Sequence, residues 1–148
     1  DVSASTRLRY YEKGFNHFLE NPILGSGIGN WQLFSIKLDY DKIESYIVPY
    51  VAHNDYIELL TEIGIFGMAA YLLFILSSLY FLLITFFKSK DYEAQNICLI
   101  LTLPFIIYFT DSNLNFPQYR PIMQVGLITY LMLVYSFYEN QKSKALKE

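Results

Sequence analysis

The chain has 148 residues, of which 53% are hydrophobic and 18% aromatic, and its formal net charge is −3. A chain this apolar differs from an ordinary small soluble domain, and without a basic patch it is not expected to bind nucleic acid. Charged side chains are concentrated in residues 1–62, 88–93 and 139–148, separated by long stretches with few or no charges. The sequence therefore predicts a water-exposed part joined to a membrane part.

The N-terminal region is predicted to begin with an amphipathic helix. Ser5 and Thr6 are good N-cap residues, and apolar side chains then recur at helical spacing until the helix ends near Pro22. These apolar side chains are Leu8, Tyr11, Phe15, Phe18 and Leu19. The glycine-rich residues 25–30 are expected to form a flexible turn, and residues 31–49 an ordered loop near the membrane surface.

The next element is a helix that continues into the first membrane span. Asp55-x-x-Glu58 has the form of a capping box, so this helix is expected to start near Tyr56. It leads into residues 63–87, an uncharged stretch long enough to cross a hydrocarbon core of about 30 Å.

Two shorter apolar stretches follow, residues 94–110 and 121–138. Both are at the lower limit for spanning a membrane, and together they predict a helical hairpin in which Pro104 kinks the first helix. The alternative is a soluble bundle of buried helices, which three long apolar stretches disfavour because they leave too little polar surface. The predicted fold class is therefore all-α integral membrane, with about three transmembrane helices.

Lysines set the expected orientation. They follow the first and third spans, at Lys88, Lys90, Lys142, Lys144 and Lys147. By the positive-inside rule, these points face the cytoplasm. Residues 1–62, an amphipathic helix and loop, then lie outside together with the polar loop of residues 111–120; residues 63–138 form the transmembrane helices, and residues 139–148 a cytoplasmic tail. Because the chain opens with Asp1 and shows no signal peptide, we expect a fragment that lacks upstream spans.

His53 and Asn54 are candidate site residues because they directly precede the predicted helix start. A histidine with an ordinary pKa of about 6.5 can remove a proton from a sugar hydroxyl at neutral pH. The simpler alternative is a loop histidine that only packs or caps, and this alternative is stronger still for His17 on the amphipathic helix. Spacing alone favours the structural role for both histidines.

All three arginines of the chain, Arg7, Arg9 and Arg120, are placed outside, against the positive-inside bias. Arginine forms bidentate hydrogen bonds with phosphate oxygens, so these side chains suit a diphosphate headgroup. Ion pairing or snorkelling is the alternative, equally weighted for Arg7 and Arg120 and favoured for Arg9. Residues 111–120 could likewise line a sugar site or form a plain interfacial turn.

Metal and nucleotide chemistry have little support in the sequence. His53 has no second histidine at ligand spacing, and Cys98 lies in an apolar stretch as a small buried hydrophobe, so no zinc site is expected. Gly25-x-Gly27-x-Gly29 lacks the final glycine of a dinucleotide fingerprint, and no Gly-x-Ser-x-Gly nucleophile turn is present.

Three segments carry motifs in a set order. Residues 5–11 read Ser-Thr-Arg-Leu-Arg-Tyr-Tyr, residues 20–31 contain Asn-Pro-Ile-Leu-Gly-Ser-Gly, and residues 52–67 open with Ala-His-Asn-Asp. Together they resemble the O-antigen ligase and polymerase superfamily, in which an arginine opens an outer helix, an Asn-Pro-x-x-Gly-x-Gly turn closes it and a His-Asn pair begins the next span. Residues 115–117, Asn-Phe-Pro, are similar to a further family motif, whereas Tyr11 stands where many members have Trp.

The resemblance implies a GT-C-like multi-helix fold in the bacterial cytoplasmic membrane, with its active face outside. It implies metal-independent, cofactor-free and inverting transfer of a glycan from an undecaprenyl-diphosphate carrier to an acceptor hydroxyl on lipid A core or on a growing polysaccharide. Arg7 would match the family arginine that engages the diphosphate, and His53 the histidine that activates the acceptor. Asn54, Arg120 and Arg9 are further candidates for substrate binding.

Two other functions remain open from the sequence. A protein O-oligosaccharyltransferase would share every motif and differ only in its acceptor. A non-catalytic membrane component that binds or exports glycan would not need His53. In the loop 35–49, Asp39, Asp41 and Glu44 could form a solvated face or contact the acceptor, and the solvated face is favoured.

Overall fold

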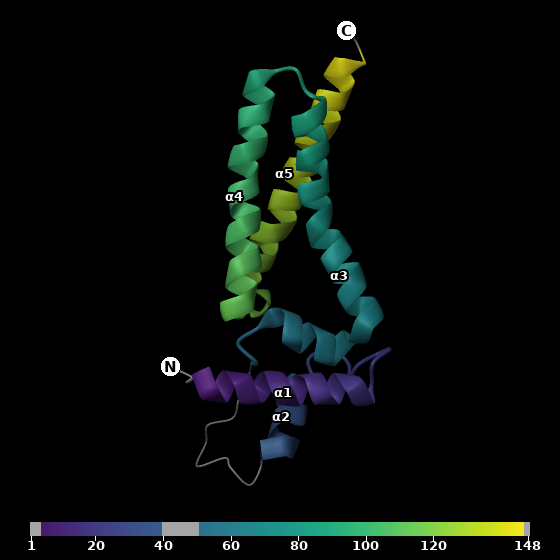
Figure 1. Ribbon diagram of the computed structural model, residues 1–148, viewed down its shortest axis with the longest axis vertical. Helices are drawn as coiled ribbons and strands as arrows, with labels where there is room; N and C mark the ends of the chain where they lie inside the picture. The colour runs from purple at the N-terminus through teal and green to yellow at the C-terminus, as the bar shows by residue number, and fades with distance from the viewer. Residues whose placement is uncertain (1–3, 40–50, 147–148) are drawn as a thin grey trace. The chain divides into compact units, whose positions relative to one another are not determined.

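The computed structural model describes residues 4–39 and 51–146, apart from the side chains of residues 38 and 39. Its elements are α1 (Ala4–Glu20), α2 (Trp31–Asp39), α3 (Asp55–Lys88), α4 (Tyr92–Leu114), the short 3-10 helix η2 (Pro117–Tyr119) and α5 (Pro121–Ala145) (Figure 1). All regular structure in the described residues is thus helical, which confirms the predicted all-α class.

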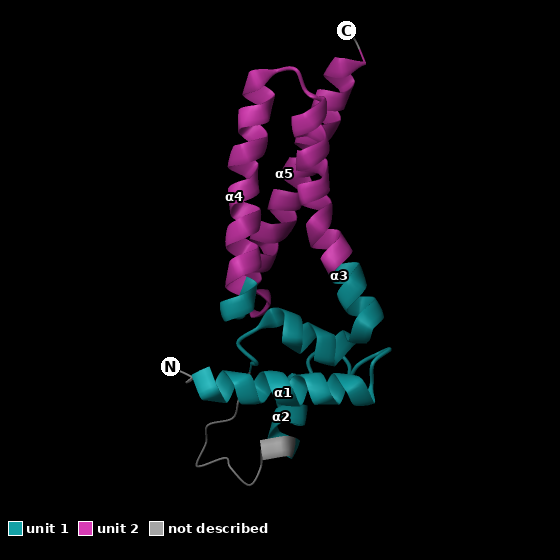
Figure 2. Ribbon diagram, in the orientation of Figure 1, with its two compact units in different colours: residues 1–71, 112–116 teal, residues 72–111, 117–148 magenta. Residues whose placement is uncertain are grey.

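The chain divides into two compact units (Figure 2). The first unit comprises residues 1–71 and 112–116, and the second unit comprises residues 72–111 and 117–148. The first unit therefore contains α1, α2 and the beginning of α3, together with a short segment from the end of α4.

The three predicted membrane spans are confirmed as helices that are long and apolar enough to cross a bilayer, namely α3, α4 and α5. Their outward faces are apolar as well: on α4 the exposed side chains include Leu99, Ile100, Leu103, Ile106 and Ile107. A soluble bundle would present polar side chains there, so this surface suits lipid. Residues 111–114, expected in a loop, instead form the last turn of α4, and α5 continues to Ala145.

The second unit has a small core of its own. Leu82, Cys98 and Val134, one from each long helix, are buried against partly buried aromatic side chains. The hydroxyl of Tyr130 on α5 donates a hydrogen bond to the Leu101 carbonyl of α4 at 2.9 Å. Cys98 is a free, buried thiol, as its apolar surroundings in the sequence predict.

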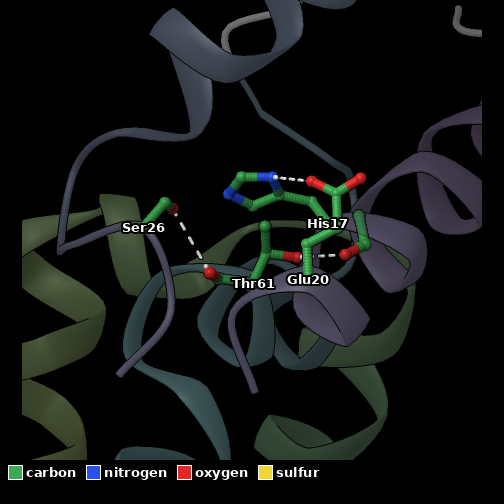
Figure 3. A network of polar contacts seen from close by, with 5 residues as sticks. His17, Glu20, Ser26 and Thr61 are labelled. Atoms are coloured by element: carbon green, nitrogen blue, oxygen red, sulfur yellow. Dashed lines mark hydrogen bonds and ion pairs between the residues drawn. The ribbon is translucent and has the colours of Figure 1, made fainter. Parts of the chain in front are cut away.

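The first unit is built around the buried residues Tyr10, Trp31 and Ala52. The helices α1 and α3 approach most closely at Gly14, where an added Cβ would lie only 2.9 Å from Thr61 Oγ1 and 3.1 Å from the Trp31 ring. Thr61 Oγ1 also donates to the Gly14 carbonyl at 3.1 Å (Figure 3). The side of α1 that carries Tyr10 and Gly14 is therefore the buried side.

Residues 31–39 form the helix α2, so the prediction of a loop is wrong for this segment; residues 40–50 lie outside the described residues. The reason is a set of contacts made by distant residues. Trp31 is fully buried, and its main-chain N–H donates to Glu62 Oε1 at 2.8 Å. This contact fixes the first residue of α2, although the segment has no amphipathic period of its own.

The helix α3 is not continuous, contrary to the prediction that it runs unbroken into the span. Gly64 has φ 64° and ψ −169°, which are not helical values, and the ribbon of α3 changes direction along its length (Figure 1). Residues 55–63, the short section of α3, lie beside α1, and residues 65–88, the span section, follow the break. A left-handed φ with this ψ is accessible essentially to glycine alone.

The turn after α1 holds this break in place. Ser26 N–H donates to the Thr61 carbonyl at 3.0 Å and Gly27 N–H to the Glu62 carbonyl at 2.8 Å, which satisfies two carbonyls at the end of the short section. Ile65 N–H, at the start of the span section, donates to the Pro22 carbonyl at 2.9 Å. The glycine-rich turn thus caps both helix ends at Gly64.

Candidate functional site

The site begins at the N-terminus of α3, where Asn54 is the N-cap. Its Oδ1 accepts hydrogen bonds from Tyr56 N–H at 3.0 Å and Ile57 N–H at 3.1 Å. The predicted capping box starting at Asp55 is therefore wrong by one position: Asp55 is fully buried in the first turn, and Glu58 bonds outside that turn. Asparagine is as good an N-cap residue as aspartate, and Asn54 directly precedes Asp55 in the sequence, which explains the error of one position.

His53 has a left-handed backbone, with φ 59°, and among the described residues no other non-glycine residue has positive φ. Such a conformation costs on the order of 1–3 kcal/mol and persists only when neighbouring groups hold it. Here the hydroxyl of Tyr11 donates to the His53 carbonyl at 3.1 Å, and Glu58 Oε2 accepts from Ala52 N–H at 2.7 Å. The main chain is therefore held on both sides of His53.

Two buried carboxylates of the short section of α3 orient the segments around it. Glu58 and Glu62 are at most 2% exposed, and each accepts a main-chain N–H, from Ala52 and Trp31 respectively. A buried carboxylate is tolerated only when such groups bond to it. From the sequence, Glu58 is assigned to a capping box and Glu62 is not identified, although acids at positions 55, 58 and 62 recur at helical spacing on one face.

The imidazole of His53 lies edge-on to Phe116, with ring centroids 5.3 Å apart. Burial lowers the pKa of His53 below its ordinary value, and the positive charge of Arg7 lowers the pKa further. Both effects disfavour the imidazolium form. The ring is thus held neutral at neutral pH, which is the form that can accept a proton.

Arg7 reaches the same region from α1. Its Nη1 donates to the Leu114 carbonyl at 3.1 Å, while Asn54 Nδ2 donates to the Asn113 carbonyl at 3.2 Å. Arg7 is one helical turn from Tyr11, so both face the same flank of α1. Together with the His53–Phe116 contact, these bonds bring Arg7, His53 and Asn54 around residues 113–116, within the first unit.

The first unit does not bring the other two predicted arginines to His53. Arg9 is about 160° around α1 from Arg7, and its guanidinium lies 5.6 Å from the centroid of the Tyr10 ring. Arg120 belongs to the second unit, where it is the N-cap residue of α5 and its N–H donates to the Pro117 carbonyl at 3.0 Å. Only Arg7 is brought to His53 within the first unit.

A separate hollow of about 420 Å³ lies in the first unit between α1 and α2, lined by Lys13, His17, Glu20 and Lys37 among others. His17 pairs with Glu20 at 3.7 Å (Figure 3), and its ring packs 4.1 Å from that of Phe34. Around α1, Lys13 and Glu20 are about 120° and 140° from Arg7, and His17 is about 80° from it. The packing of His17 fits the structural role that the sequence favours for it.

No group of three His, Cys, Asp or Glu side chains in residues 4–37 and 51–146 is arranged to hold a metal ion. The side chains gathered around residues 113–116 are an imidazole, a guanidinium and an amide. This set can accept a proton, bind an anion and orient a hydroxyl.

Comparisons with curated proteins and with solved structures gave no match. A family model described as O-antigen ligase matches residues 1–72, just under half of the chain. The matched part contains Arg7, the turn that caps the break in α3, and the His53–Asn54 pair. The resemblance to the O-antigen ligase family is therefore confirmed over residues 1–72.

Proposed function

We propose that this site transfers a glycan from an undecaprenyl-diphosphate carrier to an acceptor hydroxyl, outside the bacterial cytoplasmic membrane. The observation that carries the proposal is the convergence of Arg7 and a neutral His53 on residues 113–116, in a chain whose first half matches the O-antigen ligases. The acceptor is proposed to be lipid A core or a growing polysaccharide, and the reaction to need neither metal nor cofactor.

In the proposed reaction, His53 removes the proton from the acceptor hydroxyl as its oxygen attacks the anomeric carbon of the glycan. A new C–O bond forms on one face of the sugar while the bond to the diphosphate oxygen breaks on the other, so the anomeric carbon is inverted. The undecaprenyl diphosphate leaves as an anion, and the proton remains on the imidazole. A diphosphate leaves readily, so the enzyme mainly has to align the substrates and neutralise charge.

The guanidinium of Arg7 is suited to bind the leaving diphosphate. A guanidinium has five N–H donors, and the bond to the Leu114 carbonyl uses Nη1, so other donors remain for phosphate oxygens. Its positive charge next to His53 has a second effect, because it keeps the imidazole unprotonated before reaction. Asn54, which is bonded to the same segment, is proposed to orient the acceptor or a sugar, and Arg120 and Arg9 are proposed further substrate contacts.

The test is glycan transfer in cell membranes by the complete protein carrying His53→Ala or Arg7→Ala, with abundance checked by blot. General-base catalysis contributes about 10²- to 10⁴-fold, so transfer by His53→Ala should fall by at least about 10²-fold at normal abundance. His17→Gln and Lys90→Ala, which change no residue proposed to contact substrate, serve as matched controls and should retain transfer.

Two results would reject parts of this proposal. Unchanged transfer by His53→Ala would remove the base assignment and favour a component that only binds or exports glycan. If both variants lose transfer as expected, but the wild type transfers glycan to a protein and not to a lipid or polysaccharide, the proposed acceptor would be replaced by a protein hydroxyl.

A further inference from the structure

The helix α1 leaves an apolar stripe unused by the core of the first unit. Leu8, Phe15 and Leu19 are all exposed, Leu8 to 65%, and they fall within about 40° of one another around the helix. The buried residues Tyr10 and Gly14 lie about 140° away from this stripe. The most regular apolar face of α1 therefore points away from its own protein core.

The apolar surface continues into the turn after α1. Ile23 and Leu24 are exposed, Leu24 to 79%, although the turn is bound tightly to α3 through its main chain. An added Cβ on Gly64 would overlap the Ile23 carbonyl, and Ile65 N–H bonds to the Pro22 carbonyl at 2.9 Å. Ile23 and Leu24 are thus fixed beside the first residues of the span section, where Phe66 is 70% exposed.

This attachment determines the depth of the turn. The span section, residues 65–88, is about 36 Å long at 1.5 Å per residue. Crossing a hydrocarbon core of about 30 Å therefore takes up most of its length. Its start at Ile65 must therefore lie close to the edge of the hydrocarbon core. Because the turn is hydrogen-bonded to that start, Ile23 and Leu24 lie at the same depth.

We propose that the Ile23–Leu24 turn inserts into the outer edge of the bilayer and that α1 lies along the interface, with Leu8, Phe15 and Leu19 toward lipid. The polar side chains of Lys13 and Glu20 are about 120–140° from this stripe, as in interfacial helices. Lipid is the occupant because the surface is continuous with the start of a membrane span. The proposal concerns how the protein sits in the bilayer and does not depend on the proposed catalytic roles.

One consequence is that the residues around His53 are held at the membrane surface. Tyr11, on α1, bonds to the His53 carbonyl, and the short section of α3 packs on α1 at Gly14. An interfacial α1 would keep His53 within reach of a group attached directly to a lipid. The turn would then set the height of the site in the membrane.

The experiment uses the complete protein in nanodiscs of phosphatidylcholine and phosphatidylglycerol, with nitroxide labels at single cysteines. Cys98→Ala removes the one cysteine of these 148 residues, any further cysteine of the complete protein is replaced in the same way, and labels are then placed by Leu24→Cys and Phe15→Cys. Phe74→Cys, an exposed position in the span section, is the lipid control, and Glu20→Cys is the water control. Accessibility of each label to oxygen and to a nickel chelate is measured by power-saturation spectroscopy.

We expect the labels at positions 24 and 15 to be more accessible to oxygen than to the nickel chelate, as at position 74, with position 15 the shallower. Greater accessibility to nickel at position 24, as at position 20, would overturn the proposal. Protection from both reagents at position 24 would also overturn it, because another part of the protein would then cover the turn. A water-exposed label at position 15 would reject the interfacial helix.

Discussion

The hydroxyl of Tyr11 donates a hydrogen bond to the main-chain oxygen of His53 at 3.1 Å, across 42 positions of sequence. This bond ties the helix that carries Arg7 to the residue proposed as the base. It also holds a left-handed residue that would otherwise relax. Tyr11 is where many members of the resembled family have Trp, and both side chains carry a donor at the tip of an aromatic ring.

Tyr11→Phe is expected to lower the free energy of unfolding by about 1 kcal/mol and to reduce the turnover number for transfer, because His53 loses one restraint. Tyr11→Trp retains an N–H donor and is expected to keep more activity than Tyr11→Phe. The measurement is kcat and KM for transfer by each variant in nanodiscs. Equal kcat for wild type and Tyr11→Phe would mean that the hydrogen bond does not position His53.

The lowered pKa of His53 predicts the pH dependence of transfer. A base works when unprotonated, so the rate should rise with pH up to the lowered pKa and remain level through neutral pH. Arg7→Gln removes a positive charge that disfavours the imidazolium, so the pKa of His53 should rise toward its ordinary value but not reach it, because burial is the larger cause. The check is a nuclear magnetic resonance titration of labelled histidine. A downward shift in Arg7→Gln would contradict this account.

Gly64→Ala is expected to be strongly destabilising. Alanine at this backbone conformation costs on the order of 1–3 kcal/mol, and its Cβ would also overlap the Ile23 carbonyl, so the loss should exceed about 3 kcal/mol. Two other glycines provide matched controls. Gly29 has φ 79° but open space around it, so Gly29→Ala should cost only the backbone term, whereas Gly126→Ala, inside α5, should be neutral or stabilising.

Thermal unfolding in detergent ranks these three glycine variants. The order Gly64→Ala, then Gly29→Ala, then Gly126→Ala, from least to most stable, is the expected result. If Gly64→Ala were as stable as Gly29→Ala, the mutual capping of the turn and α3 would not be a tight contact.

Glu58→Ala is expected to destabilise the first unit by about 1–3 kcal/mol, because Ala52 N–H loses its acceptor in a buried place. Glu58→Gln keeps a side-chain oxygen that can accept the same hydrogen bond, and should cost less. Hydrogen exchange at the Ala52 amide is the specific readout: it should speed up in Glu58→Ala and change little in Glu58→Gln. Exchange at the Ala52 amide in Glu58→Ala as slow as in the wild type would show that Glu58 does not hold this segment.

The parts of the fold that depend on local composition could be predicted from the sequence. The spans follow from apolar stretches long enough to cross a bilayer, and α1 from its helical spacing before Pro22. The break at Gly64 could not be predicted, because a single glycine in an apolar stretch is compatible with a helix. Its cause is hydrogen bonding to Pro22, Ser26 and Gly27, about 40 positions earlier.

The candidate site was predicted in part for the same reason. His53, Asn54 and Arg7 belong to motifs that a reader of the sequence can recognise, and the structure brings them to one segment. Tyr11 and Glu58 lie in the same motif segments, but their hydrogen bonds to the main chain on either side of His53 could not be predicted from the sequence. Their roles arise from tertiary contacts, as does the burial of Trp31 that starts α2.

The most direct test of His53 as the base is the single-turnover rate of transfer by His53→Gln in nanodiscs, with defined lipid-diphosphate glycan and acceptor both saturating. We expect a loss of about 10²- to 10⁴-fold in this rate, with binding of the lipid-diphosphate glycan unchanged, because the proposed contact of Arg7 with the diphosphate is retained. A rate equal to that of the wild type would contradict the role of His53 as the base.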